Sequence, residues 1–253
     1  MSNTHLPVEL LDHVVEHLHG REGALRNCCL VSKSWIPRAR KHLFADIRFN
    51  TEEDLDSWKK KFPDPSISPG HYTKTLLIDC PHIFASADVE AGGWIRGFSR
   101  VVHFGVDTRG LYFHHSHAPL VSFHGFSPLV KSLRVKFVTI PSSQIFDFIL
   151  SFPLLEDLAV FKGGSDGSPT LDRLPNPPKF TGSLELIVTR MRPIVRQLLS
   201  LSSGIHFRKL VLGWTCDGDV LSTSALIERC SHTLESLDIT CYAFGTPVQQ
   251  LFP

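Results

Sequence analysis

The sequence carries almost no excess of charge of either sign. Its 26 Lys and Arg residues are balanced by 25 Asp and Glu residues, which leaves a formal net charge of +1. A chain with this balance has no overall field that would attract nucleic acid, an anionic membrane or an acidic substrate. We therefore expect no nucleic-acid partner and no membrane partner, and the choice of a partner must depend on local groups.

Long apolar runs and targeting signals are also absent. No segment has about 18 apolar residues without a charge, so nothing predicts a membrane-spanning helix. The first residues, MSNTHLPVELL, lack a basic start followed by a long apolar stretch, so nothing predicts a secretory signal. The six cysteines have no regular spacing, which favours reduced thiols and a location in the cytoplasm, the nucleus or both.

The motifs of several large enzyme classes are missing too. The sequence contains no G-x-S-x-G, no G-x-x-x-x-G-K-S/T and no G-x-G-x-x-G. Its Gly-rich and turn-like segments do hold aspartates, which stabilise turns through their own backbone contacts; these are Asp166, Asp172, Asp217 and Asp219. We therefore expect no active site and no cofactor, and we do not expect an enzyme.

Histidines form the densest cluster of candidate metal ligands. The members are His103, His114, His115, His117 and His124. A second, smaller cluster is made by Cys230, His232 and Cys241. Neither cluster has the two-pair spacing of a structural zinc site, and a polar surface explains the residues as well. We expect no bound metal.

The stretch from Leu6 to Ile47 predicts three short helices with more apolar surface than so small a unit can bury. The first helix begins near Pro7 and ends at Gly20. Its apolar residues recur at helical spacing and form one broad stripe: Leu10, Leu11, Val14, Val15 and Leu18. The second helix is expected over about 22–30 and the third over about 35–43.

Four features of this stretch agree in order and spacing with a known pattern. They are Leu6-Pro7, Leu10-Leu11, the run from Cys29 to Trp35 (CLVSKSW), and the run from Arg40 to Phe44 (RKHLF). Together they resemble the F-box family, and the chain is similar to fungal F-box-domain-containing proteins. The resemblance implies docking onto a Skp-family adaptor, and through it onto a cullin-RING ubiquitin ligase.

Carried over position by position, the family pattern implies a set of adaptor-binding residues: Leu6, Pro7, Leu10, Leu11, Val14, Leu18, Val31 and Trp35. An alternative is that several of them, especially Val14, Val31 and Trp35, form the core of the small helical module. We favour docking for the exposed half of the stripe, because three short helices cannot bury it among themselves.

A helix and a break follow the opening module. The segment Thr51-Glu52-Glu53-Asp54 has the spacing of a capping box, and it predicts a helix of about three turns. Four helix-breaking residues come next: Pro63, Pro65, Pro69 and Gly70. We divide the chain into an F-box (1–48), a linker helix with a Pro-rich break (49–72) and a third part (73–253).

Short apolar strands recur through the third part. The anchors have an apolar, variable, apolar pattern; they begin at Leu76, Val101, Leu133, Leu158, Leu184, Leu210 and Leu237, and lie 25 to 32 residues apart. The period and the L-x-x-L-x-L core resemble leucine-rich repeats. Each unit would stack on its neighbours to share one core, with returning helices at 144–152, 194–199 and 226–230.

The predicted fold class is therefore α/β: a three-helix F-box module followed by an irregular leucine-rich-repeat-like solenoid with a parallel sheet of about seven strands. The longest interval, from Val101 to Leu133, could hold an extra strand within 110–123. No returning helix follows Ile239. We expect either a partner surface at this end or a chain shortened relative to its relatives.

Two functional hypotheses follow. In the first, the protein is the substrate-recognition subunit of a Skp-cullin-F-box-type ubiquitin ligase, and the repeats hold an unknown protein substrate. The substrate-binding positions are those that point away from the strand core: Arg134, Lys136, Asp157, Phe161, Glu185, Lys209, Asp238 and Thr240. In the second, the protein is an interaction scaffold with no ubiquitin role, whose N-terminal helices cap the solenoid.

Overall fold

The computed structural model describes residues 7–80, 93–107, 126–136, 142–161, 178–187, 192–201, 204–214 and 220–241. Over these residues the protein is α/β, with seven α-helices and one open sheet of eight strands. All neighbouring strands pair in parallel. The predicted α/β class and parallel sheet are confirmed.

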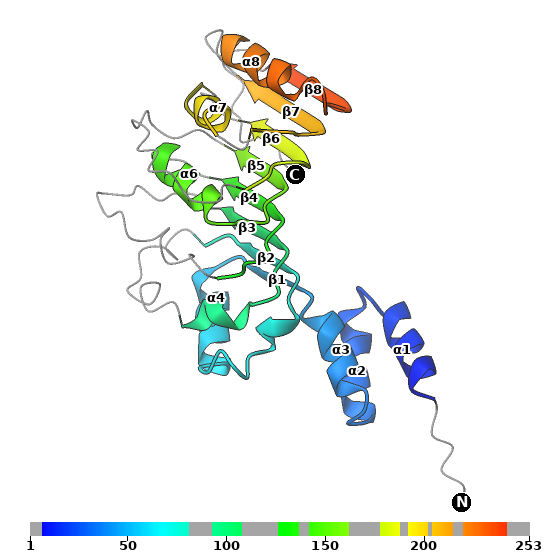
Figure 1. Cartoon of the computed structure of the whole chain (residues 1–253). Helices are drawn as coiled ribbons and strands as arrows, with labels where there is room; N and C mark the ends of the chain where they lie inside the picture. The colour runs from blue at the N-terminus through cyan, green and yellow to red at the C-terminus, as the bar shows by residue number, and fades with distance from the viewer. Residues whose placement is uncertain are drawn as a thin grey trace, which may run out of the picture.

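Three helices form a small bundle at the N-terminal end: α1 (Val8–His17), α2 (Glu22–Val31) and α3 (Ile36–Leu43). Both α1 and α2 pack on α3. The inside of the bundle is made by Val15, Leu25, Cys28 and Ala39, which are all buried. Figure 1 places α1 on the side of the bundle that faces away from the sheet.

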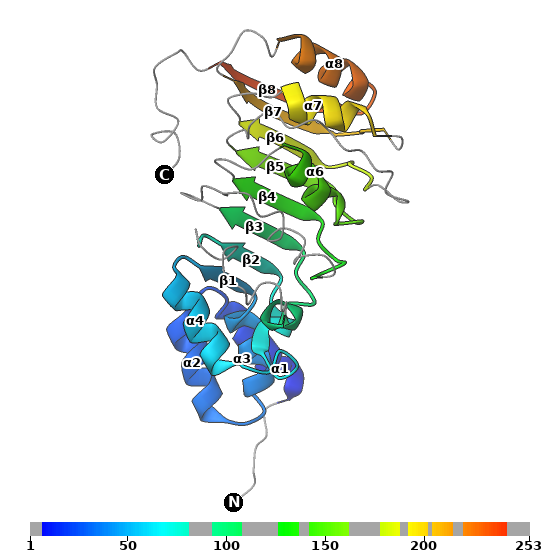
Figure 2. The same ribbon diagram turned by 90° about the vertical axis from the view of Figure 1, so that its left-hand side faces the viewer.

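The eight strands lie side by side in the order in which they occur in the sequence (Figure 2). Their bounds are β1 (Asp46–Phe49), β2 (Thr75–Ile78), β3 (His103–Asp107), β4 (Ser132–Lys136), β5 (Asp157–Phe161), β6 (Ser183–Ile187), β7 (Lys209–Trp214) and β8 (Ser236–Cys241). Because neighbouring strands are parallel, each connection must bring the chain back to the end of the sheet at which the previous strand began.

Two rows of apolar side chains run across the strands. The pairing register aligns Ile47, Leu76, Phe104, Leu133, Leu158, Leu184, Leu210 and Leu237 in one row. Two residues further along each strand, a second row runs from Phe49 on β1 to Ile239 on β8. On β2 to β7 both rows are buried in a single core. The side-chain period of two residues on a strand explains this pattern.

The third strand begins later than the sequence pattern indicated. Val101 was the expected anchor, but β3 starts at His103 and Phe104 occupies the first apolar row. Phe104 lies 28 residues after Leu76 and 29 before Leu133, so the long interval disappears. Val101 is buried just before the strand, which explains why its apolar character was misleading. The extra strand expected within 110–123 lies outside the described residues.

Helices cover one face of the sheet (Figures 1 and 2). They are α4 (Glu52–Lys61), α6 (Ser142–Leu150), α7 (Arg192–Leu199) and α8 (Val220–Cys230), with the short 3-10 helices η1 (Pro69–Tyr72) and η2 (Trp94–Gly97) near the N-terminal end. The three returning helices expected from the sequence are therefore present as α6, α7 and α8, with bounds that differ by a few residues.

The strand-and-helix pattern starts earlier than expected. Strand β1 overlaps the end of the predicted opening module (1–48), and α4 follows it as later helices follow later strands. Leu55 of α4 is buried, and the ring of Trp58 lies 5.8 Å from that of Phe49. The segment 49–72 therefore contributes to the same core as the rest of the sheet.

The core is incompletely covered at β8. Leu237 and Ile239 remain 44% and 42% exposed, although Leu210 and Leu212 beside them on β7 are buried. Within the described residues, α8 is the last helix, and no helix follows β8 in the sequence. None of the helices in the described ranges is both long and apolar enough to cross a membrane.

Candidate binding surfaces

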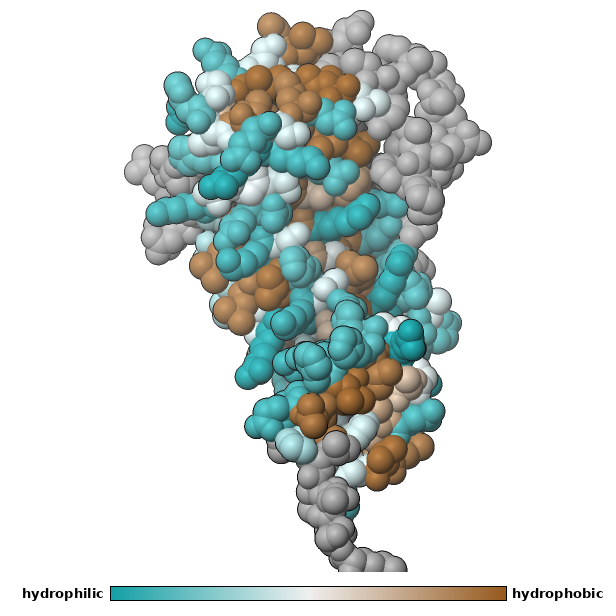
Figure 3. Space-filling model, turned by 90° about the vertical axis from the view of Figure 1, so that its right-hand side faces the viewer, coloured by the Kyte–Doolittle hydropathy of each residue, from teal (hydrophilic) through white to brown (hydrophobic). Residues whose placement is uncertain are grey.

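Large apolar side chains are exposed on each of the first two helices. Leu10 and Val14 of α1 are 51% and 45% exposed, and Leu30 and Val31 of α2 are 84% and 69% exposed. Leu10 and Val14 are four residues apart, so they lie on the same side of α1. In Figure 3, brown patches interrupt the surface at this end of the molecule. We call these four residues the N-terminal apolar surface.

The residues expected to bind an adaptor fall into three groups. Pro7, Leu10, Val14 and Val31 are exposed, whereas Leu18 and Trp35 are half-buried. Leu11 is buried in the bundle beside Val15, so it supports the fold rather than the surface. Leu6 lies outside the described residues.

The structure also answers a question left open by the sequence. Val14 and Val31 are exposed and do not form the core of the bundle. Leu30 is the most exposed of the large apolar residues in the described ranges, and it was not among the positions expected to bind a partner. The signal was present, because Leu30 follows Cys28 by two positions and so faces away from the buried side of α2.

Charged side chains tie α1 to α3. The guanidinium of Arg38 on α3 donates to the carboxylate of Asp12 on α1. In the same bundle, the His19 ring lies 5.7 Å from the His42 ring. Burial lowers the pKa of His42, and the nearby charge on His19 lowers it further. The bundle therefore keeps a fixed arrangement of α1 on α3, on which the N-terminal apolar surface depends.

A second candidate surface lies on the face of the sheet that carries no helices. Residues of β1 to β5 surround a hollow of about 260 Å³, which we call the strand groove. Its charged lining residues are Arg48, Asp79, Asp107, Arg134 and Lys136. Figure 3 looks onto this side of the molecule, where hydrophilic side chains cover much of the sheet.

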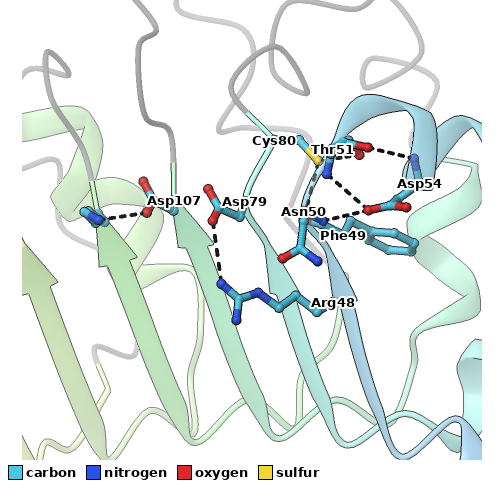
Figure 4. Close-up of polar contacts among 9 residues, drawn as sticks. Arg48, Phe49, Asn50, Thr51, Asp54, Asp79, Cys80 and Asp107 are labelled. Atoms are coloured by element: carbon cyan, nitrogen blue, oxygen red, sulfur yellow. Dashed lines mark hydrogen bonds and ion pairs between the residues drawn. The ribbon is translucent and has the colours of Figure 1, made fainter. Parts of the chain in front are cut away.

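Two ion pairs cross between strands in the groove. Arg48 Nη2 lies 3.7 Å from Asp79 Oδ2, and Lys136 Nζ lies 3.0 Å from Asp107 Oδ2. Figure 4 shows Arg48 reaching from β1 toward Asp79. Both carboxylates are largely shielded from solvent. This shielding strengthens the pairs relative to exposed ones.

Arg134 has a different partner. Its guanidinium carbon lies 4.5 Å from the centre of the Phe161 ring, which is itself buried. Gly105 lies between Leu77 and Arg134 in the register, and a Cβ at Gly105 would collide with Leu77 Cδ2. A side chain at position 105 would thus fill part of the strand groove.

Three of the expected substrate-binding residues meet in the strand groove: Arg134, Lys136 and Phe161. The others lie elsewhere on the sheet. Lys209, Asp238 and Thr240 are exposed on β7 and β8, and Glu185 is half-buried on β6.

Asp157 has a structural role in the fold. Its Oδ1 accepts hydrogen bonds from the Ser183 backbone N–H at 2.6 Å and from the Ser183 hydroxyl at 2.7 Å. These bonds join the start of β5 to the start of β6. The carboxylate is therefore used within the sheet, and Asp157 does not line the groove.

Seven residues that line the groove were not expected from the sequence: Arg48, Leu77, Ile78, Asp79, Gly105, Val106 and Asp107. Strand β1 had been assigned to the opening module, and β3 had been anchored too early. The triplets Ile47-Arg48-Phe49 and Phe104-Gly105-Val106 have the same apolar, variable, apolar pattern as the recognised strands. Aligning them with the other strands identifies Arg48 and Gly105 as outward positions of β1 and β3.

No group of three possible metal ligands exists within the described ranges. His114, His115, His117 and His124 of the histidine cluster lie outside those ranges, and His103 is exposed at the start of β3. In the second cluster, Cys230 is a buried free thiol.

Neither the protein-family models nor the curated proteins contain a match to this chain.

Proposed function

We propose that the protein is a non-catalytic substrate adaptor of a Skp-cullin-F-box-type ubiquitin ligase. In this proposal α1 to α3 act as an F-box, and β1 to β8 with their helices act as a leucine-rich-repeat-like solenoid that holds a protein substrate. The protein works in the cytoplasm, the nucleus or both. Tethering raises the effective concentration of the substrate at the ubiquitin-carrying enzyme, without any bond chemistry in this chain.

The observation that carries the proposal is the N-terminal apolar surface. Its four residues remain exposed in a bundle whose inside is already filled by Val15, Leu25 and Cys28. Large apolar side chains that gather on a surface are typical of a protein-protein interface. They occur in the stretch whose sequence resembles the F-box family, and this agreement supports an adaptor as the partner.

The strand arrangement supports the second half of the proposal. Eight parallel strands in sequence order, with helices on one face, match the stacking of repeated strand-and-return units. Such an array leaves its helix-free face available to a partner. The strand groove lies on that face and is the candidate substrate surface.

The competing hypothesis makes the N-terminal helices a cap of the solenoid. A cap would bury the apolar side of α1 against the first strands. Leu10 is half exposed, and α1 lies on the side of the bundle away from the sheet (Figure 1). These observations favour docking of an outside partner.

The test is co-purification of the full chain with a purified Skp-family adaptor. We expect the wild-type chain to bind, and a Leu10→Asp, Val31→Asp double variant to lose at least about tenfold in affinity, because both charges would enter an apolar interface. Both positions are exposed, so the variant should fold.

Ile67→Asp is the matched control, since Ile67 is 73% exposed but lies outside the bundle. It should bind the adaptor as the wild type does. Failure of the wild-type chain to bind the adaptor, or undiminished binding by the double variant, would overturn the proposal.

A further inference from the structure

Arg134 is the cation of the strand groove that has no carboxylate within ion-pair distance among the described residues. Asp79 pairs with Arg48, and Asp107 pairs with Lys136. Arg134 instead stacks on the ring of Phe161. The described lining has three cations and two carboxylates, so the groove keeps local positive charge at Arg134.

The cation-π contact with Phe161 uses the charge of the guanidinium and leaves its N–H donors available. The donors of arginine lie in the plane of the group, so a ring below that plane does not use them. Phe161 is buried and cannot readily move, which limits the orientations of the guanidinium above it. A planar donor pair held in this way is suited to two oxygens of a carboxylate or phosphate, and little ordering is needed on binding.

The hollow beside Arg134 suits side chains better than a large small molecule. Its volume of about 260 Å³ falls just under the roughly 300–1,000 Å³ of typical small-molecule sites. Leu77 and Gly105 make part of its floor, so it also offers apolar contact. An anionic side chain next to an apolar one would therefore match the lining.

The register sets the spacing of such side chains. Arg48, Leu77, Gly105 and Arg134 follow one another on adjacent strands. Three strand spacings separate the two arginines, or about 14 Å, and an extended peptide rises about 3.3 Å per residue. A peptide that crosses the strands would reach both arginines with side chains four residues apart, which point to the same side.

We propose that the strand groove binds an extended, acidic segment of the partner protein, with one carboxylate or phosphate on Arg134, an apolar side chain over Leu77 and Gly105, and a second anion near Arg48. This inference deepens the proposed function, since it rests on the helix-free face being the substrate surface. It does not depend on the adaptor that binds the N-terminal helices.

The experiment measures binding of labelled peptides to the purified full chain by fluorescence anisotropy, with no adaptor present. The probe has glutamates at positions i and i+4 and valine midway between them. We expect saturable binding that weakens as salt is raised, because ion pairs at a partly open surface are screened. A glutamine version should bind at least about tenfold more weakly, since charged hydrogen bonds are lost.

Arg134→Ala should reduce affinity for the glutamate peptide at least about tenfold. Arg134→Lys should recover only part of it, because lysine keeps the charge but lacks the planar donor pair. Arg100→Ala is the matched control: Arg100 is exposed and does not line the groove. Circular dichroism and adaptor binding by each variant report whether the fold and the N-terminal function are intact.

A phosphoserine version of the peptide separates the two sources of the anion. Tighter binding than the glutamate peptide would assign a phosphorylated segment, and equal or weaker binding would assign an acidic one; either result supports the groove as an anion site. Absence of peptide binding, equal binding of the glutamine version, or an unaffected Arg134→Ala variant would overturn the inference. Adaptor binding in the same preparations would leave the proposed function standing.

Discussion

At the scale of the residue, Cys80 shows how a buried thiol is used for structure. It follows β2, and its thiol donates to the Thr51 carbonyl oxygen at 3.0 Å and to the Phe49 carbonyl oxygen at 3.5 Å (Figure 4). Burial raises the pKa of Cys80 from 9.0 to about 11, and the charge of Asp54 adds to the rise. The thiol therefore stays protonated and bonded near neutral pH.

This raised pKa predicts a loss of stability in alkali. The folded state favours the neutral thiol, so its contribution is complete below pH 9.0 and is lost as the pH rises toward about 11. The free energy of unfolding of the wild type should fall more steeply over this interval than that of Cys80→Ala. Urea unfolding at several pH values measures both slopes, and parallel slopes would contradict the prediction.

At the scale of the element, α4 joins the N-terminal bundle to the sheet. Its first turn is closed by a capping box, in which Thr51 Oγ1 accepts from the Asp54 N–H at 3.2 Å and Asp54 Oδ2 accepts from the Thr51 N–H at 3.3 Å. Near its other end, Trp58 lies 6.1 Å from Phe44 and 5.4 Å from Phe98, measured between ring centres. These aromatic contacts hold the segment after α3 against the start of the core.

Trp58→Ala should therefore destabilise the protein by about 3 kcal/mol, the lower end of the cost of removing a large aromatic, because Trp58 is only partly buried. Trp58→Phe should cost less, since it keeps an aromatic ring in the cluster. Chemical denaturation measures both values. A cost under about 1 kcal/mol for Trp58→Ala would mean that the cluster adds little to stability.

At the scale of the whole molecule, the apolar rows weaken toward β8. Leu210 and Leu237 are neighbours in the same row, yet Leu210 is fully buried and Leu237 is 44% exposed. The expectation from the sequence that the last strand has an uncovered apolar side agrees with this exposure. A leucine in this row thus contributes less to stability at β8 than at β7, because its burial depends on having a neighbouring strand on both sides.

The pair offers a matched test. Leu210→Ala should cost about 3–4 kcal/mol in unfolding free energy, and Leu237→Ala about 1 kcal/mol, because the second substitution removes less buried surface and leaves no closed cavity. Urea unfolding of the two variants gives the difference. Equal costs would show that β8 is as well packed as β7.

The sequence by itself determined most of the local elements. The apolar, variable, apolar triplets identified six strands, from Leu76 and from Leu133 onward, because a strand exposes alternate residues to opposite faces. The capping box at Thr51 and Asp54 identified the start of α4. It is a local signal, since the free backbone N–H groups of a helix end are bonded by side chains only a few residues away. The sequence also showed that the first helix has more apolar residues than a small bundle can bury. It did not show which of these residues are buried.

Only the tertiary structure decided which strands stand together and what their outward side chains meet. β1 joins the sheet through backbone bonds to β2, and β3 takes its register from β2 and β4, at separations of about 30 residues that no local pattern specifies. The strand groove follows from that register, which places Arg48, Leu77, Gly105 and Arg134 in one row across β1 to β4. The stacking of Arg134 on Phe161 has the same origin, because the contact exists only once β4 and β5 are paired.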